Sequence, residues 1–109
     1  MFKVNIKPLS INEAYRGRRF KTQKYKDYEQ ELWYKLPNKN IPDGELALEL
    51  EFGFSNKGTD IDNCIKNFTD ILQKKYLFND NRIYKLRVDK KIVKKGKEYI
   101  KYKIYGTQK

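Results

Sequence analysis

Apolar residues occupy every second position in the segment from Glu45 to Phe54. The apolar set is Leu46, Leu48, Leu50, Phe52 and Phe54. Successive side chains of a β-strand point to opposite faces of its sheet, so this alternation predicts a strand with one buried face. It is the clearest strand in the sequence, and it requires the fold to contain a β-sheet.

Other segments show the periodicity of a strand or a helix. A helix is predicted where Tyr25, Tyr28 and Leu32 recur at helical spacing, because Thr22 can cap its start and Pro37 stops it. In chain order, the sequence predicts a strand over residues 2–6, a helix over 22–36, the strand over 45–54, a helix from 61 to 75, and strands over 84–89 and 100–105.

The order of these elements is β-α-β-α-β-β, which is typical of an α+β protein. A chain of 109 residues has room for one domain with one core. We therefore expect a single domain over residues 1–109, with a mixed sheet flanked by two helices. The last two strands flank a turn at residues 94–97, and we expect them to form a terminal hairpin.

The chain is strongly basic, with 25 Lys and Arg against 14 Asp and Glu and a net charge of +11. Such an excess favours a polyanionic partner, most commonly nucleic acid, over a membrane surface. The sequence contains no run of apolar residues long enough to span a membrane, and its start does not resemble a secretory signal. We expect a cytoplasmic protein.

The sequence lacks histidine and has one cysteine, Cys64. This excludes an intramolecular disulfide, the usual Cys/His zinc sites, and Ser-His-Asp or Cys-His nucleophile systems. Any metal must bind carboxylate and carbonyl oxygens, which favours Mg²⁺ or Mn²⁺.

Two basic segments are candidates for DNA binding. One is interleaved with aromatic residues and the other lies in the turn of the expected hairpin, and together they provide Arg16, Arg18, Arg19, Lys21, Lys94, Lys95 and Lys97. The alternative is that they form solvated surfaces or a charged edge that discourages aggregation.

Two carboxylates and an amide gather at Asp60, Asp62 and Asn63, in a chain that is otherwise positive. A bound divalent cation would offset the repulsion between the carboxylates, although aspartates also cap helices. Lys66 would share the helix face of Asp62 and could neutralise charge on a phosphate, or simply form an ion pair with a helical neighbour. Asp80 is either a third carboxylate or a turn residue.

These segments together resemble the RusA family of Holliday junction resolvases. The resemblance rests on Pro8-Leu9-Ser10-Ile11-Asn12, Asp60-Ile61-Asp62-Asn63, Lys66, Asp70-Ile71-Leu72, and residues 77–83, which read Leu-Phe-Asn-Asp-Asn-Arg-Ile. It implies a homodimeric, Mg²⁺-dependent endonuclease, encoded by a bacterium or a phage, that resolves four-way DNA junctions by paired symmetric nicks in recombination and repair.

The resemblance also implies roles for individual residues. Asp60, Asp62 and Asp80 match the metal-binding acids of the family, and Lys66 matches its catalytic lysine. The family usually has two acids where this chain has Asn79-Asp80, and the expected consequence is either weaker metal binding or a preference for Mn²⁺. The alternative function is a non-catalytic basic nucleic-acid-binding module, in which the aspartates are caps and turns. Whether Asp80 completes the site of its own chain or that of a partner subunit is left open by the sequence.

Overall fold

Four strands form one mixed sheet in the order β1-β6-β4-β5. The computed structural model describes residues 1–17 and 20–107. The strands are β1 (Phe2–Val4), β4 (Leu46–Phe54), β5 (Ile83–Ile92) and β6 (Tyr99–Gly106). β4 pairs with β6 in antiparallel fashion and with β5 in parallel fashion, and β1 pairs with β6 in antiparallel fashion. The expected α+β class with a mixed sheet is confirmed.

The expected terminal hairpin was wrong. β5 and β6 do not pair with each other, because β4 lies between them. Parallel pairing of β4 and β5 needs a crossover, which the helix between them supplies. The segment from Val93 to Glu98 then crosses the end of β4 to reach β6. Its turn is nevertheless present, since the amide of Lys97 donates to the carbonyl of Lys94 over 2.9 Å.

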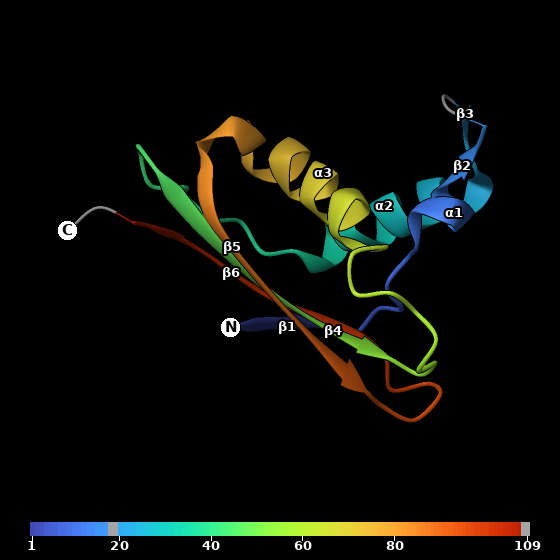
Figure 1. The fold of residues 1–109 in the computed structure, drawn as a ribbon. Coiled ribbons are helices and arrows are strands. Elements are labelled where there is room, and N and C mark those ends of the chain that lie inside the picture. Colours follow the sequence, from blue (N-terminus) through green and yellow to red (C-terminus); the bar gives the residue numbers. More distant parts are fainter. Residues whose placement is uncertain (18–19, 108–109) are drawn as a thin grey trace.

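Two long helices cover the same face of the sheet (Figure 1). They are α2 (Gln23–Lys35) and α3 (Ile65–Tyr76). Thr22 caps α2 as predicted, because its side chain accepts a hydrogen bond from the amide of Tyr25. The alternating residues of β4 face these helices, and the shared core includes Leu32, Leu50, Phe68, Ile71 and Ile100, each fully buried.

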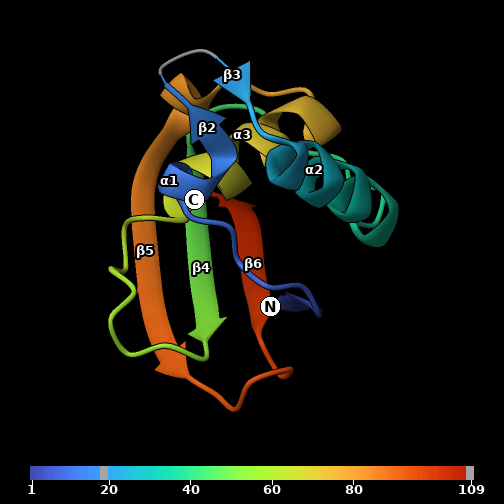
Figure 2. The same ribbon diagram turned by 90° about the vertical axis from the view of Figure 1, so that its right-hand side faces the viewer.

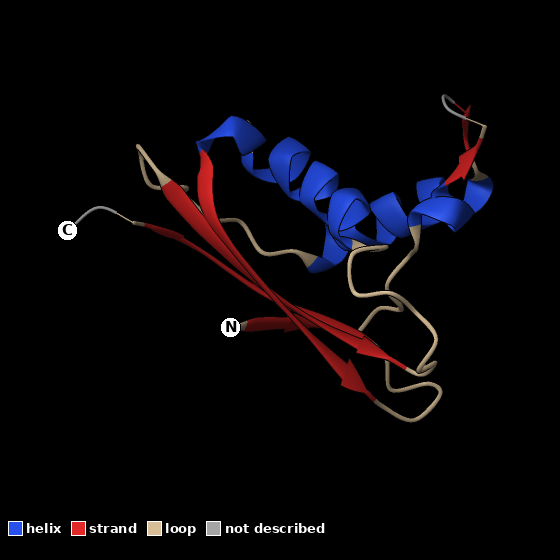
Figure 3. Cartoon of the chain, viewed as in Figure 1, coloured by secondary structure: helices blue, strands red, loops and turns tan. Residues whose placement is uncertain are grey.

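The described residues contain a third, short helix that the sequence did not predict, so the sheet is not flanked by two helices alone. This helix is α1 (Ile11–Ala14), and Ser10 caps it by accepting from the amide of Glu13. It leads into a small hairpin of β2 (Tyr15–Arg16) and β3 (Phe20–Lys21), where the sequence predicted only a basic loop. Figure 3 shows this short helix and hairpin beside the two long helices.

The face of the sheet opposite the helices carries tyrosines tied to glutamates. Tyr99 donates to Glu51 over 2.6 Å, and Tyr105 donates to Glu49 over 2.8 Å. The ring of Tyr99 lies directly over Gly53, where a β-carbon would collide with it. None of the described helices is long and apolar enough to cross a membrane.

Candidate active site

Asp60 and Asp62 lie in a series of turns that precedes α3. The predicted helix start at Ile61 was wrong, because α3 begins at Ile65 and residues 61–64 form turns. The amide of Asn63 donates to the carbonyl of Asp60 over 3.2 Å. The amide of Ile65 donates to the carbonyl of Asp62 over 3.3 Å. The side chain of Ile61 is exposed rather than packed in the core. The two carboxylates are therefore displayed on an exposed loop.

Distant segments hold this loop in place. The amide of Ile11 donates to the carbonyl of Asn63 over 2.9 Å, so the segment with the pattern Pro-x-Ser-x-Asn binds directly to the segment with the pattern Asp-x-Asp-Asn. On the other side, the ammonium of Lys90 on β5 donates to the carbonyl of Lys57 over 3.0 Å and to that of Thr59. The position of the carboxylates is thus set by tertiary contacts from both sides.

Asp62, Lys66 and Asp80 line one cavity of about 540 Å³. Residues of α3, β4, β5 and the turn before β5 form its wall, and Asp70 also lines it. Leu48, Ile65, Ile83 and Leu86 give the wall an apolar part. A single chain therefore brings Asp62 and Asp80 to the same cavity.

The side chain of Gln73 fixes the turn that carries Asp80. Its carbonyl oxygen accepts a hydrogen bond from the amide of Asp80 over 2.9 Å. Its amide nitrogen lies 3.4 Å from a carboxylate oxygen of Asp70 and donates to it. The side chain of Asn79 accepts a hydrogen bond from the amide of Asn81 over 3.0 Å. Asn79 therefore serves as the cap of the short 3-10 turn Asp80–Arg82.

Lys66 forms an ion pair with Asp70, one helical turn later, over 3.1 Å. The hydrogen bond and charge of Asp70 raise the pKa of Lys66 above its ordinary value, and the charge of Asp80 acts in the same direction. Lys66 consequently remains positively charged at neutral pH. It provides the cavity with a cation beside its carboxylates.

The three expected metal ligands are not all brought together. Asp60 is absent from the described residues that line the cavity, and in residues 1–17 and 20–107 no three Cys, Asp or Glu side chains are grouped closely enough to hold a metal ion. Mg²⁺ usually retains several waters and binds one or two carboxylates together with substrate phosphates. The oxygen donors of Asp62 and Asp80 fit that mode of binding.

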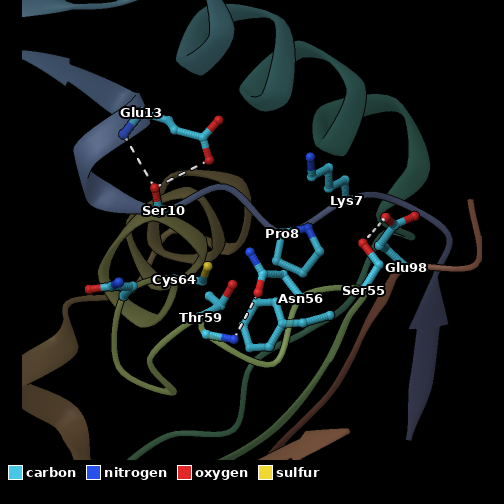
Figure 4. A pocket seen from close by; sticks show the side chains of 12 residues that line it. Lys7, Pro8, Ser10, Glu13, Ser55, Asn56, Thr59, Cys64 and Glu98 are labelled. Carbon is cyan, nitrogen blue, oxygen red and sulfur yellow. Dashed lines mark hydrogen bonds between the residues drawn. The ribbon is translucent and has the colours of Figure 1, made fainter. Parts of the chain in front are cut away.

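A second cavity, of about 300 Å³, lies behind the loop that carries the aspartates. Figure 4 shows Ser10, Glu13, Asn56, Thr59 and Cys64 around it. Its polar groups bind one another: the hydroxyl of Ser10 donates to Glu13 over 3.3 Å, and the amide of Gly58 donates to the side chain of Asn56 over 2.8 Å. The first bond stabilises the start of α1, and the second stabilises the loop that leads to Asp60.

The two predicted DNA-binding segments lie at opposite ends of the molecule, as Figures 1 and 2 show. Arg16 and Lys21 are exposed on the small β2–β3 hairpin, whereas the second segment is the exposed loop between β5 and β6, with Lys94, Lys95 and Lys97. Arg18 and Arg19 lie outside the described residues. Among the basic residues that the structure describes, Arg16 and Lys21 therefore do not share one surface with Lys94, Lys95 and Lys97.

Sequence reasoning did not identify Asp70, which lines the cavity, or Gln73, which fixes the turn that carries Asp80. Asp70 follows Lys66 by four positions, and that helical spacing was an available signal. Nothing in the sequence indicated that Gln73 binds the backbone of Asp80, because that contact depends on how the chain turns after α3.

The family model described as Endodeoxyribonuclease RusA matches residues 7–103 of the chain. None of the curated proteins compared with the chain matches it. The family match spans every residue of the cavity and the segment at residues 8–12. The enzymes of this family hydrolyse phosphodiester bonds within DNA. The chain therefore belongs to the RusA family of endodeoxyribonucleases.

Proposed function

We propose that this protein is a divalent-metal-dependent endonuclease that resolves four-way DNA junctions at the cavity lined by Asp62, Lys66 and Asp80. The observation that carries the proposal is that one chain gathers these three side chains around one cavity. The family assignment supports it, because RusA enzymes act on branched DNA. The same observations favour an enzyme over a non-catalytic binding module, which would need no such gathering.

Asp62 and Asp80 would hold Mg²⁺, with Mn²⁺ as the alternative ion. Both carboxylates are exposed to solvent at the cavity and offer the oxygen ligands that these ions prefer. We retain Asp60 as a candidate ligand because it lies two residues before Asp62 on the same exposed loop. When bound, such an ion would activate water for attack and polarise the phosphodiester.

The protein side chains would position the phosphate and accept protons. Lys66 would place its ammonium beside the phosphate and neutralise the negative charge that develops there. Because the chain lacks histidine, a carboxylate of the cavity would be the side chain that accepts a proton. Asp70 would keep Lys66 in place through their ion pair.

A homodimer would allow paired symmetric nicks. A four-way junction has two-fold symmetry, and a two-fold dimer would present one cavity to each of two opposed strands. β5 is an edge strand, and Ile92 at its C-terminal end is exposed and lies outside the cavity lining. We propose the C-terminal end of β5 as the contact between subunits. We also propose that the enzyme acts in the cytoplasm of a bacterium, encoded by the host or by a phage.

The test is incubation of the purified protein with a synthetic four-way junction in Mg²⁺, in Mn²⁺ and in a chelator. We expect paired nicks that require a divalent ion. Asp62→Asn should abolish cleavage while junction binding is kept or tightened, because it removes a negative charge near phosphate. Asp27→Asn, an exposed acid on α2 outside the cavity, is the matched control and should cleave like the wild type.

Junction binding without cleavage in either ion would overturn the proposal and favour the binding module. Cleavage by Asp62→Asn within a few-fold of the wild type would instead refute the site assignment alone.

A further inference from the structure

The two sides of α2 differ in character. On one side, Asp27 accepts a hydrogen bond from Gln23 over 2.8 Å, and Glu31 pairs with Lys35 over 2.6 Å, so the acids are satisfied within the helix. The other side faces α3 and forms one wall of a groove of about 450 Å³. The groove is lined by Lys26, Glu29, Gln30, Trp33, Tyr34 and Lys74. We call this the α2–α3 groove.

Two aromatic side chains are exposed at this groove. Trp33 is 45% exposed and Tyr34 is 84% exposed, whereas several other aromatic side chains of the protein are buried in the core. The ammonium of Lys75 lies 5.0 Å from the centre of the Trp33 ring and donates to the backbone carbonyl of Trp33 over 3.0 Å. The indole is thus held in a fixed position with nearly half of its surface in solvent. Exposed planar rings of this kind are suited to stacking against bases.

The groove carries more positive than negative charge. Glu29 is the acidic residue among the described residues that line the groove. The ammonium of Lys74 forms an ion pair with its carboxylate over 2.7 Å and neutralises its charge. Lys26 adds a second positive charge to the lining, and Lys75 a third beside it. The nearby ammonium of Lys74 lowers the pKa of Lys21. Crowded ammonium groups are stabilised by an anion between them.

The α2–α3 groove and the candidate active site both include residues of α3. Lys66 lines the cavity, Lys74 lines the groove, and Asp70 lies between them at helical spacing. Eight residues of helix span about 12 Å at 1.5 Å per residue. In duplex DNA, phosphates of one strand are spaced about 3.4 Å along the axis. A strand cut at the cavity would therefore reach the groove within about four phosphates.

We infer that the α2–α3 groove binds unpaired nucleotides of the DNA substrate, with bases stacked on Trp33 and Tyr34 and a phosphate bound by Lys26. The inference rests on the proposed function for the class of ligand. Nucleic acid suits the groove better than a protein partner does, because aromatic rings alternate with ammonium groups and the acid is already neutralised. Nucleotides beside a branch point are the part of the substrate whose bases can leave the stack.

Intrinsic fluorescence tests the inference directly, because Trp33 is the single tryptophan of the chain. Metal-free protein would be titrated with an oligothymidylate of about 16 nucleotides and with a duplex of the same length. We expect saturable quenching of Trp33 by the single strand, and weaker quenching by the duplex. Tyr34→Ala should weaken single-strand binding about fivefold or more, because it removes one stacking platform.

Matched control variants show whether a loss of binding comes from the groove itself or from removing any exposed tyrosine or lysine. Tyr84→Ala, which removes a tyrosine that is 66% exposed on β5, should leave the affinity within about twofold of the wild type. Lys26→Gln should weaken binding and reduce its salt dependence, whereas Lys39→Gln, an exposed lysine outside the groove, should do neither. Because Lys26 and Tyr34 are exposed, all four variants should fold, and circular dichroism checks this.

Junction cleavage in Mg²⁺ is measured separately, so the two proposals fail in different ways. Cleavage without quenching by the single strand, or quenching that Tyr34→Ala leaves unchanged, would overturn the groove as a binding site. Quenching that Tyr34→Ala weakens, in a protein that cleaves no junction, would support the groove and refute the proposed function.

Discussion

Gln73 connects α3 to the turn that carries Asp80. It accepts a hydrogen bond from the amide of Asp80 and donates one to Asp70, which in turn holds Lys66. The resemblance to the RusA family indicated Asp60, Asp62, Lys66 and Asp80, because the motifs that carry it can be recognised in the chain before it folds. It did not name Gln73, because the role of Gln73 exists only after the chain has folded back along α3.

The first prediction concerns Gln73→Leu. The variant keeps the size of the side chain but cannot accept from the amide of Asp80, so the turn should shift. We expect unfolding free energy to fall by only about 1 kcal/mol, the usual net value of one hydrogen bond. Cleavage should fall by about tenfold to a hundredfold, because small misplacement of catalytic groups is costly.

The control for Gln73→Leu is Gln23→Leu, which breaks an exposed side-chain bond on α2. Single-turnover cleavage across a series of Mg²⁺ concentrations would measure both variants. A Gln73→Leu enzyme that cleaves at the wild-type rate would show that Gln73 does not position Asp80.

At the scale of elements, local patterns predicted β4 and α2 well. The apolar periodicity of both elements and the Thr22 cap can be recognised from residues that are close together in the sequence. The neighbours of β4 were not predictable in this way, because parallel pairing with β5 depends on the crossover through α3. The start of α3 was placed too early for a similar reason: Ile61 fits the helical period, but contacts from Ile11 and Lys90 hold residues 57–63 as a loop.

The second prediction separates a structural lysine on β5 from a lysine of the following loop. Lys90 donates to two backbone carbonyls of the loop that leads to Asp60, whereas Lys94 is exposed. Lys90→Met should lower the unfolding free energy by about 1.5–3 kcal/mol, the range for hydrogen bonds to a charged group. It should also slow cleavage, because the loop carries Asp60 and Asp62.

Lys94→Met should have the opposite profile. We expect unchanged stability and a decrease of about 0.9 in the magnitude of the log–log salt slope of DNA binding, because one ammonium group no longer binds a phosphate. Chemical denaturation and binding titrations at several salt concentrations measure both variants. Equal stability of the two variants would contradict the structural role of Lys90.

At the scale of the whole molecule, the structure changes the expectation about how a dimer would work. A predicted helix over residues 61–75 left open whether Asp80 could reach Asp62 in the same chain. The observed α3 begins at Ile65, and the turn that follows it bends back to Gln73, so both acids line one cavity. We therefore expect each subunit to hold a complete site.

The third prediction is that inactive subunits will not complement each other. Asp62→Asn and Asp80→Asn proteins mixed under subunit exchange should remain unable to cleave, because every cavity lacks one acid. A mixture of wild type with Asp62→Asn is the positive control, since half of its exchanged sites stay intact. Restored nicking in the mutant mixture would show that the sites are shared between subunits.

A change of metal preference at Asp62 and Asp80 would test the proposed metal site itself. Asp62→Cys and Asp80→Cys each replace a proposed oxygen ligand with a thiolate, which binds soft ions better than Mg²⁺. The native Cys64 does not interfere, because it is buried and its burial raises the pKa of the thiol to about 12. Each variant should lose cleavage of a four-way junction in Mg²⁺ and recover it in Mn²⁺ or Cd²⁺, while the wild type is active in Mg²⁺. Wild-type cleavage in Mg²⁺ by either variant, or a loss that no thiophilic ion restores, would contradict the claim that Asp62 and Asp80 of one chain bind the catalytic metal.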